Sequence, residues 1–146
     1  MLRRVMPPLV RHHAANYAAT VTSTQVILAC SPIDRNSYGY KGFYIDAIRV
    51  IDFLLQRPEV DPTRIGVRGG SQGGALTLLA AALRPQIAAA SAGAPYLAGM
   101  IDAVALTNSQ PYQEINDYLR FYPDSRAAVT ETLAYYDCIN FAERIR

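Results

Sequence analysis

Cysteine is scarce in this chain, which has Cys30 and Cys138 and no others. The two stand far apart, and no C-x-x-C pair or cysteine–histidine cluster surrounds either one. Structural zinc sites need such closely spaced ligands, so the sequence argues against a zinc site. We expect two free, buried thiols in a reducing compartment, because free cysteine is among the most buried residue types.

Long apolar runs and a strong excess of one charge are also missing. No run approaches the roughly 20 apolar residues of a membrane helix. Pro7-Pro8 and Arg11 interrupt the stretch behind the basic N-terminus, which argues against a secretory signal. The net charge is +2, from 14 basic and 12 acidic residues, too little to favour nucleic acid. We expect a cytoplasmic protein that binds neither membranes nor nucleic acids.

Acidic residues are absent from positions 1–33, and Asp34 is the first. This region contains one apolar segment, 25–30, that is typical of a buried strand. We therefore divide the chain into an atypical N-terminal segment, 1–37, disordered or foreign to the rest of the chain, and a domain over 38–146. The length of 146 residues and the apolar content of 51% are ordinary for a globular protein with one domain.

A strand–helix–strand pattern lies at the centre of that domain. Two short apolar segments flank an Ala/Leu-rich run of high helix propensity, and the three elements are expected at 65–68, 75–83 and 87–91. A turn signal, Asp61-Pro62, precedes the first strand. Because βαβ units form parallel sheets covered by helices, we predict an α/β fold.

Helices are expected on both sides of this unit. Apolar residues at 3.6-residue spacing predict a helix over 43–56, behind a loop over 34–42. Charged side chains three residues apart can pair along its exposed face, Asp46 with Arg49 and Arg49 with Asp52. Downstream, prolines separate amphipathic segments typical of a cap over an active site, at about 97–106, 113–120 and 125–135.

The turn between the first strand and the central helix carries the motif that indicates chemistry. Positions 69–74 read Gly-Gly-Ser-Gln-Gly-Gly and fit G-x-S-x-G, the nucleophile elbow of α/β-hydrolases. There the serine stands on a sharp, strained turn that exposes its hydroxyl, and small neighbours let the turn form. Ser71 is the candidate nucleophile, and the backbone N–H of Gln72, at the positive end of the helix, is the candidate oxyanion donor. The expected elbow glycines are Gly69, Gly70, Gly73 and Gly74.

A glycine-rich turn also has simpler explanations. It can merely let a strand and a helix pack, or it can bind a phosphate at the helix N-terminus. The glycine spacing does not match the dinucleotide fingerprint G-x-G-x-x-G, and no Walker lysine follows. The flanking strand and helix favour the elbow.

No histidine follows the candidate nucleophile in this sequence. In α/β-hydrolases the chain order is serine, acid, histidine, whereas the histidines here are His12 and His13, both before Ser71. We interpret the two as part of a polar tail. Four aspartates follow the serine without the strand-end position that marks a triad acid: Asp102, Asp117, Asp124 and Asp137. An ordinary triad therefore cannot be completed within this chain.

Residues from about 38 to 146 resemble the acetyl xylan esterase / cephalosporin C deacetylase family. Positions 40–49, Y-K-G-F-Y-I-D-A-I-R, are similar to the family's Y-R-G-x-Y-L-D-A-V-R. Positions 61–74 place D-P-T-R-I-G-V-R before G-G-S-Q-G-G, a specific combination in this family. Further similar stretches outside the elbow lie at 110–115, 132–137 and 140–142.

This resemblance implies a partial α/β-hydrolase fold and a serine esterase that removes acetyl groups from acetylated carbohydrates or related small esters. Ser71 and Gln72 match the family's nucleophile and its backbone oxyanion donor. No metal or organic cofactor is implied, and homo-oligomers, often hexamers, are expected. Family chains are more than twice as long, with the triad acid and histidine downstream of the matched region. We therefore expect a central fragment with weak activity of its own.

Two alternatives stay open beside the esterase. One is a non-catalytic, truncated hydrolase that acts only in binding or assembly, since no histidine follows Ser71. The other is a serine peptidase of the prolyl-oligopeptidase type, which uses a similar Gly-Gly-Ser-x-Gly-Gly elbow. The similar stretches at 40–49 and 110–115 favour the esterase.

Overall fold

The computed structural model describes residues 32–146. The expectations for His12, His13, Cys30 and the strand over 25–30 lie outside the described residues. Within 32–146, no helix is both long enough and apolar enough to cross a bilayer. Cys138 is a buried free thiol, as expected.

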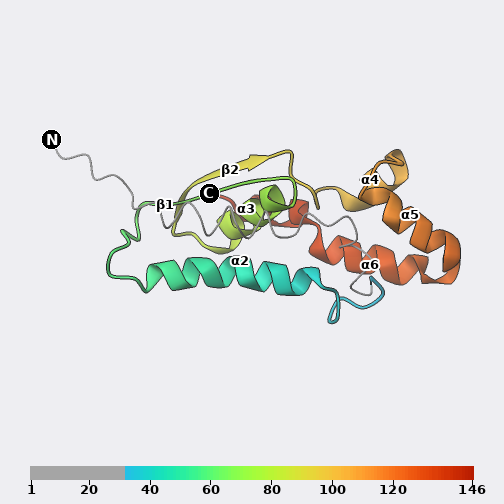
Figure 1. The fold of residues 1–146 in the computed structure, drawn as a ribbon, viewed down its shortest axis with the longest axis horizontal. Helices are drawn as coiled ribbons and strands as arrows, with labels where there is room; N and C mark the ends of the chain where they lie inside the picture. The colour runs from blue at the N-terminus through green and yellow to red at the C-terminus, as the bar shows by residue number, and fades with distance from the viewer. Residues whose placement is uncertain (1–31) are drawn as a thin grey trace.

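A parallel two-stranded sheet and the helix that joins its strands form the centre of the fold (Figure 1). Strand β1 (Ile65–Gly70) leads into helix α3 (Gln72–Leu83), which leads into strand β2 (Ile87–Gly93). The strands pair in register from Ile65 opposite Ile87 to Gly70 opposite Gly93, with one irregularity between Ile65 and Gly66. This confirms the predicted α/β class with a small parallel sheet.

Each of these three elements is longer than predicted at the end that meets the elbow. The strand predicted to end at Arg68 reaches Gly70, and the helix predicted to begin at Ala75 begins at Gln72. Strand β2 likewise runs to Gly93 rather than Ser91. Propensity treats glycine as a breaker, but here the pairing between the two strands continues through the glycines and leaves one residue, Ser71, for the turn.

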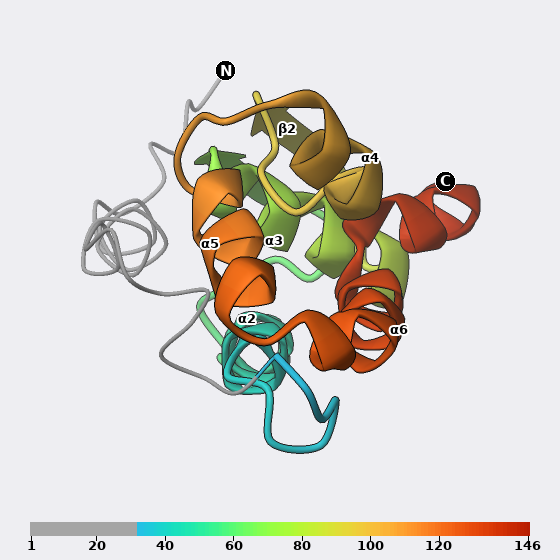
Figure 2. The same cartoon turned by 90° about the vertical axis from the view of Figure 1, so that its right-hand side faces the viewer.

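Helix α3 is buried on several sides because it lies between the sheet and helix α2 (Tyr40–Leu55) (Figures 1 and 2). Its sequence is apolar all round, as expected for a helix in the interior. Leu79 belongs to the larger core cluster and Ala80 to a smaller one with Ile51 and Ile65. Helix α3 therefore joins two cores.

Helix α2 begins at Tyr40, three residues before the predicted start, so the loop predicted over 34–42 ends at Gly39. Gly42 is part of the reason for expecting a loop, yet a Cβ there would meet nothing within 4 Å. A glycine on the exposed face costs only about 1 kcal/mol relative to alanine, which the packing of the helix overrides. Tyr40, Tyr44 and Ile51 are its buried residues.

Three short helices and two 3-10 turns follow the sheet and gather around one end of α3 (Figure 2). Their bounds are α4 (Met100–Leu106), α5 (Tyr112–Phe121), η1 (Pro123–Ser125), α6 (Arg126–Tyr136) and η2 (Cys138–Arg144). The predicted segments 113–120 and 125–135 match α5 and α6 to within one residue at each end. The segment predicted from 97 starts later, because Leu97 and Gly99 have φ of 70° and 65° and cannot continue a helix.

The larger core cluster contains a group of tyrosines whose rings pack against one another. The Tyr38 and Tyr136 rings lie 5.1 Å apart, and those of Tyr44 and Tyr136 lie 5.6 Å apart. The buried Tyr44 hydroxyl donates a hydrogen bond to the backbone carbonyl of Tyr136. Tilted and edge-on aromatic pairs add to the stability gained from burial alone. The group joins the start of α2 to the end of α6, two segments far apart in sequence.

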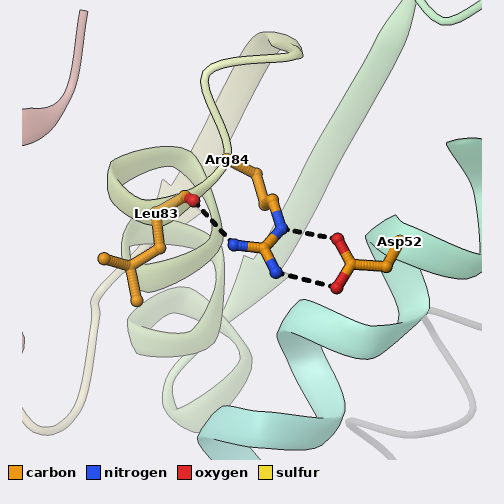
Figure 3. A network of polar contacts seen from close by, with 3 residues as sticks. All are labelled: Asp52, Leu83 and Arg84. Atoms are coloured by element: carbon orange, nitrogen blue, oxygen red, sulfur yellow. Dashed lines mark hydrogen bonds and ion pairs between the residues drawn. The ribbon is translucent and has the colours of Figure 1, made fainter.

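An ion pair ties α2 to the end of α3 (Figure 3). Arg84 Nε lies 2.6 Å from Asp52 Oδ1, and Arg84 Nη2 lies 2.7 Å from Asp52 Oδ2, a bidentate arrangement. Arg84 Nη1 also donates to the carbonyl of Leu83 at 2.9 Å. The expectation that Asp52 pairs with Arg49 within the helix is therefore wrong. A guanidinium fork that reaches both carboxylate oxygens gives a better geometry than a pair along one helix.

Replacing Asp52 by Asn should lower the free energy of unfolding at neutral pH, and acid should remove the difference. The hydrogen bond from Arg84 holds the pKa of Asp52 below its ordinary value. A carboxyl whose pKa is lowered by folding stabilises above its unfolded pKa of about 3.9, and this contribution is lost as pH falls through the folded pKa.

Chemical unfolding of wild type and Asp52→Asn from pH 7 down into the acid range measures this effect. Asp124→Asn is the matched control, since Asp124 is exposed. An unfolding difference for Asp52→Asn that stayed constant across this range would contradict the ion-pair explanation.

Candidate active site

Ser71 occupies the single residue between β1 and α3 and has φ 52° and ψ −118°. Residues with a side chain rarely adopt positive φ, and holding one there costs about 1–3 kcal/mol. Ser71 is also exposed. A strained, exposed serine between a strand and a helix is the geometry that a nucleophile elbow requires.

Three backbone hydrogen bonds hold Ser71 in this conformation. Its N–H donates to the carbonyl of Gly93 at 2.9 Å. Its own carbonyl accepts from Ala75 N at 3.2 Å and from Tyr96 N at 2.9 Å. The elbow is thus fixed by its own helix and by the end of strand β2 with the turn after it. The backbone of Ser71 is therefore held on both sides while the residue stays exposed.

The elbow glycines have different roles. A Cβ on Gly69 would lie 2.2 Å from the carbonyl oxygen of Gly73, so no side chain fits there. A Cβ on Gly74 would lie 3.0 Å from the carbonyl oxygen of Gly93, which makes this position tight. Gly70 has room, since the nearest atom to a Cβ would be 3.9 Å away. The expectation that small residues are needed therefore holds for Gly69 and Gly74 on packing grounds, and Gly70 does not share that constraint.

Gln72 is the first residue of α3. The first N–H groups of an α-helix have no acceptor within the helix, and they lie at the positive end of its dipole. The backbone N–H of Gln72 is thus suited to an oxyanion beside Ser71. Its side-chain Nε2 is buried and has no hydrogen-bond partner within residues 32–146.

The turn after β2 is held by a carboxylate from the far end of the chain, a feature that the sequence reasoning missed. Asp137 is buried, at 5% exposure. It accepts hydrogen bonds from Gly99 N at 2.9 Å and Met100 N at 2.7 Å, at the start of α4, and from Ile139 N at 3.0 Å. Each of its oxygens is committed to the backbone, so Asp137 stabilises the turn and is not available as a triad acid.

A second contact joins the same segments. Cys138 N donates to the carbonyl of Leu97 at 2.7 Å. Together with Asp137, this bond fixes the segment whose Tyr96 N–H reaches Ser71. The sequence offers one signal for this arrangement: an aspartate immediately before a helical turn is a typical N-cap. That signal accounts for the bond to Ile139 and not for the bonds to α4.

Two titratable side chains near the elbow, Tyr96 and Cys138, are not suited to replace the missing histidine as a base. Burial raises the pKa of the Tyr96 phenol well above its ordinary value, so it stays protonated at neutral pH. Burial and the Asp137 charge raise the pKa of the Cys138 thiol to about 11, so no reactive thiolate forms there. Of the other aspartates after Ser71, Asp117 contacts Gln113 and Arg120, and Asp102 and Asp124 are exposed.

Within 32–146, no three side chains of the types His, Cys, Asp or Glu gather into a group that could hold a metal ion. The functional roles of Ser71 and Gln72 stay predictions that rest on geometry. The elbow geometry itself is complete within the described residues, whereas no histidine lies among them.

A parallel strand–helix–strand unit with a strained, exposed serine between strand and helix defines the α/β-hydrolase class. Comparison with known proteins makes this more specific: the profile of the acetyl xylan esterase family (AXE1) matches residues 19–146. The chain belongs to the acetyl xylan esterase family. The match begins at residue 19, inside the N-terminal segment that the sequence division sets apart from the domain.

Individual relatives agree with the family. The acetyl esterase Axe7A of Xylanibacter ruminicola is 39% identical over 113 residues, which cover 77% of this chain and 25% of that protein. An acetyl xylan esterase from Paenibacillus sp. R4 superimposes with a TM-score of 0.74 at 42% identity, covering 79% of this chain and 37% of that one. Acetyl xylan esterase 1 from Thermoanaerobacterium sp. JW/SL YS485 gives 0.69 at 33% identity, covering 77% and 37%. The chain therefore spans between a quarter and two fifths of these relatives.

Gly69→Ala should destabilise the fold strongly, whereas Gly70→Ala should not. The Cβ at position 69 would overlap the backbone of Gly73, and forcing atoms into a packed site should cost at least about 2 kcal/mol. Gly70→Ala, with open space around it, should stay within about 1 kcal/mol of wild type. Urea unfolding followed by circular dichroism measures both, and equal effects of the two substitutions would show that the elbow is not packed as described.

Asp137→Asn should destabilise the chain by about 1–3 kcal/mol, because an amide offers one acceptor oxygen where the structure uses two and leaves buried N–H groups unpaired. Asp102→Asn is the matched control, since Asp102 is exposed in the first turn of α4 and should contribute less than about 1 kcal/mol through the helix dipole. Thermal and urea unfolding measure the pair. If Asp102→Asn were the more damaging of the two, Asp137 would not be the residue that fixes this turn.

Proposed function

We propose that Ser71 is the nucleophile of a serine esterase that removes acetyl groups from acetylated carbohydrates or related small esters. The observation that carries the proposal is the backbone of Ser71, exposed at φ 52° and ψ −118° at the start of α3. Membership of the acetyl xylan esterase family supports acetyl as the acyl group that is transferred. The names of the relatives support a carbohydrate as its carrier.

The chemistry follows from acyl transfer to a serine. Ser71 Oγ attacks the acetyl carbonyl carbon while its proton passes to a base, and the carbonyl oxygen becomes an oxyanion. The N–H of Gln72 donates to that oxyanion, aided by the positive end of α3. The tetrahedral intermediate then collapses, the sugar hydroxyl leaves with a proton, and acetyl-Ser71 forms. Water hydrolyses this ester by the same steps and releases acetate.

The base sets the rate that this chain can reach. No histidine follows Ser71, so the proton of Oγ has no ordinary acceptor within residues 32–146. In a well-studied serine hydrolase, removing the histidine costs about 2 × 10⁶ in turnover. We infer that the isolated chain turns over acetyl esters far below the roughly 10 s⁻¹ of ordinary enzymes.

An ester is favoured over an amide as substrate. The relatives named above are each described as esterases, and none of them is described as a peptidase. Comparing acetyl esters with proline-containing amides separates the esterase from the prolyl-oligopeptidase alternative.

Labelling with a fluorophosphonate probe tests Ser71 as the nucleophile. The probe phosphonylates a serine hydroxyl and adds a fixed mass, which intact-mass spectrometry and peptide mapping locate. We expect slow labelling at Ser71, accelerated by added imidazole, which supplies the missing base. Ser71→Ala should abolish the adduct. Ser91→Ala is the matched control, since Ser91 is an exposed serine on the neighbouring strand, and it should label as wild type does.

Two outcomes would oppose the proposal. Equal labelling of wild type and Ser71→Ala would place the reactive group elsewhere. A folded wild-type chain that stays unlabelled at Ser71 even with imidazole would leave the elbow as a packing turn, in line with the non-catalytic alternative.

A further inference from the structure

The strand–helix–strand unit that carries Ser71 has no side chain suited to accept the proton of its hydroxyl at neutral pH. Positions 62–101 include no Asp, Glu, His, Lys or Cys, and the charged residues there are all arginines. Arg68 lies three residues before Ser71 and is exposed. Arg84 is paired with Asp52 at the other end of α3. This unit therefore supplies positive charge and no carboxylate or imidazole.

The segments that pack on this unit bring ionisable side chains that stay protonated or are already used. The turn after β2 brings Tyr96, whose burial keeps the pKa of its phenol well above the ordinary value. The 3-10 turn η2 packs against α3 and brings Cys138, whose thiol has a pKa raised by burial to about 11. Asp137, just before it, accepts from three backbone N–H groups. Glu143 of η2 is an exposed carboxylate, and its contribution is open to test by substitution.

The features that favour attack on a carbonyl carbon are nevertheless assembled by the backbone. The hydrogen bonds that hold Ser71 at positive φ use its N–H and its carbonyl, and the residue stays exposed. The backbone N–H of Gln72 lies at the positive end of α3. Both strands end in a glycine, Gly70 and Gly93, and a Cβ at either one would have its nearest neighbour 3.9 Å away. The sheet edge next to Ser71 is therefore open to a small acyl group.

The two half-reactions of ester hydrolysis differ in how much they depend on a base. When the acyl donor is an aryl ester or a thioester, its oxygen or sulfur leaves as a stable anion and needs no proton from the protein. The acetyl-serine that results is an ordinary alkyl ester. Its hydrolysis requires an activated water and a proton for the serine oxygen, two tasks that a histidine performs in a triad. A missing base therefore slows deacylation more than acylation by such a donor.

We propose that this chain is a single-turnover acceptor, which takes one acetyl group from an aryl ester or a thioester onto Ser71 and retains it. Ser71 Oγ bonds to the acetyl carbon, and the bond from that carbon to the donor oxygen or sulfur breaks. The donor atom leaves with the bonding electrons, and the serine proton passes to hydroxide from the solvent. The N–H of Gln72 donates to the carbonyl oxygen during the step. The inference rests on the proposed role of Ser71 and deepens it, because it names the class of donor and the product that accumulates.

Reaction of the purified chain with p-nitrophenyl acetate at neutral pH tests the proposal. Release of p-nitrophenol should show a burst of about one equivalent per chain and then nearly stop, the kinetic mark of an accumulating acyl-enzyme. Intact-mass spectrometry should find one added acetyl group, and peptide mapping should place it on Ser71. The group should remain for hours after gel filtration removes the donor. An acetylated xylo-oligosaccharide should give far less adduct in the same time, because its sugar hydroxyl leaves only with a proton.

Matched positions separate the elbow from ordinary nucleophiles of the chain. Ser91 is exposed and lies within β2 rather than at the start of a helix. Acetylation at Ser71 should exceed that at Ser91 by about 10²-fold or more, the effect of one oxyanion donor. Ser71→Ala should remove the burst, and Ser91→Ala should keep it. Lys41 is the single lysine of the chain, and amines also react with aryl esters, so Lys41→Arg should keep both the burst and the Ser71 adduct.

Two results would overturn the proposal and leave the proposed function standing. One is steady release of p-nitrophenol far beyond one equivalent without acetyl-Ser71, since a base would then complete the cycle; Glu143→Gln and the double variant His12→Gln/His13→Gln would identify it. The other is acetylation spread evenly over Ser71 and Ser91. Fluorophosphonate labelling of Ser71 can succeed in both cases. A folded chain that takes up neither acetyl nor fluorophosphonate at Ser71 would reject the proposed function together with this inference.

Discussion

The backbone of Ser71 at positive φ is the constraint on which much of the surrounding structure depends. Holding a residue with a side chain in that conformation costs about 1–3 kcal/mol. The three hydrogen bonds to Gly93, Ala75 and Tyr96 each contribute about 0.5–1.5 kcal/mol net, which is enough to offset that cost. Without strand β2 and the turn after it, the serine would keep only the bond from its own helix. The elbow is therefore a tertiary feature, although its motif is only five residues long.

The conformation of this turn constrains the backbone of the segments around it. Gly69 must lack a side chain because Gly73 crosses directly over it. Tyr96 must present its N–H to Ser71, so the segment after β2 has to turn back, and Leu97 and Gly99 adopt positive φ to do so. That unusual backbone is then held by Asp137. Asp137, which is 38 residues from Gly99 in the sequence, thus contributes to the position of the candidate nucleophile. It binds Gly99 N, and Tyr96 in the same segment donates its N–H to Ser71.

How much of the fold and of the candidate site could be predicted from the sequence depends on how far apart in the chain the interacting residues lie. The elbow, the parallel unit and the short helices α5 and α6 are encoded by local patterns, and the sequence predicts them. The partner of Asp52 is not local: helical spacing suggests Arg49, but the bidentate geometry of Arg84, 32 residues away, wins. The role of Asp137 is hidden for the same reason, since one of its three bonds is local and two are not. The predicted ends of the elements near the elbow are wrong because glycine has a low propensity for strand and helix, whereas the pairing of β1 with β2 continues through the glycines.

The candidate site divides in a similar way: the nucleophile elbow lies within the described residues, and a histidine base does not. The strain at Ser71, its exposure and the unpaired N–H groups at the start of α3 all arise within one strand–turn–helix unit and the segments that pack on it, so none of them requires a histidine. A base acts on the serine only through a hydrogen bond to Oγ, and the backbone bonds that set the conformation of Ser71 do not include Oγ. A pre-formed elbow can therefore exist without the groups that activate it. Its reactivity, rather than its shape, is the property that depends on a base.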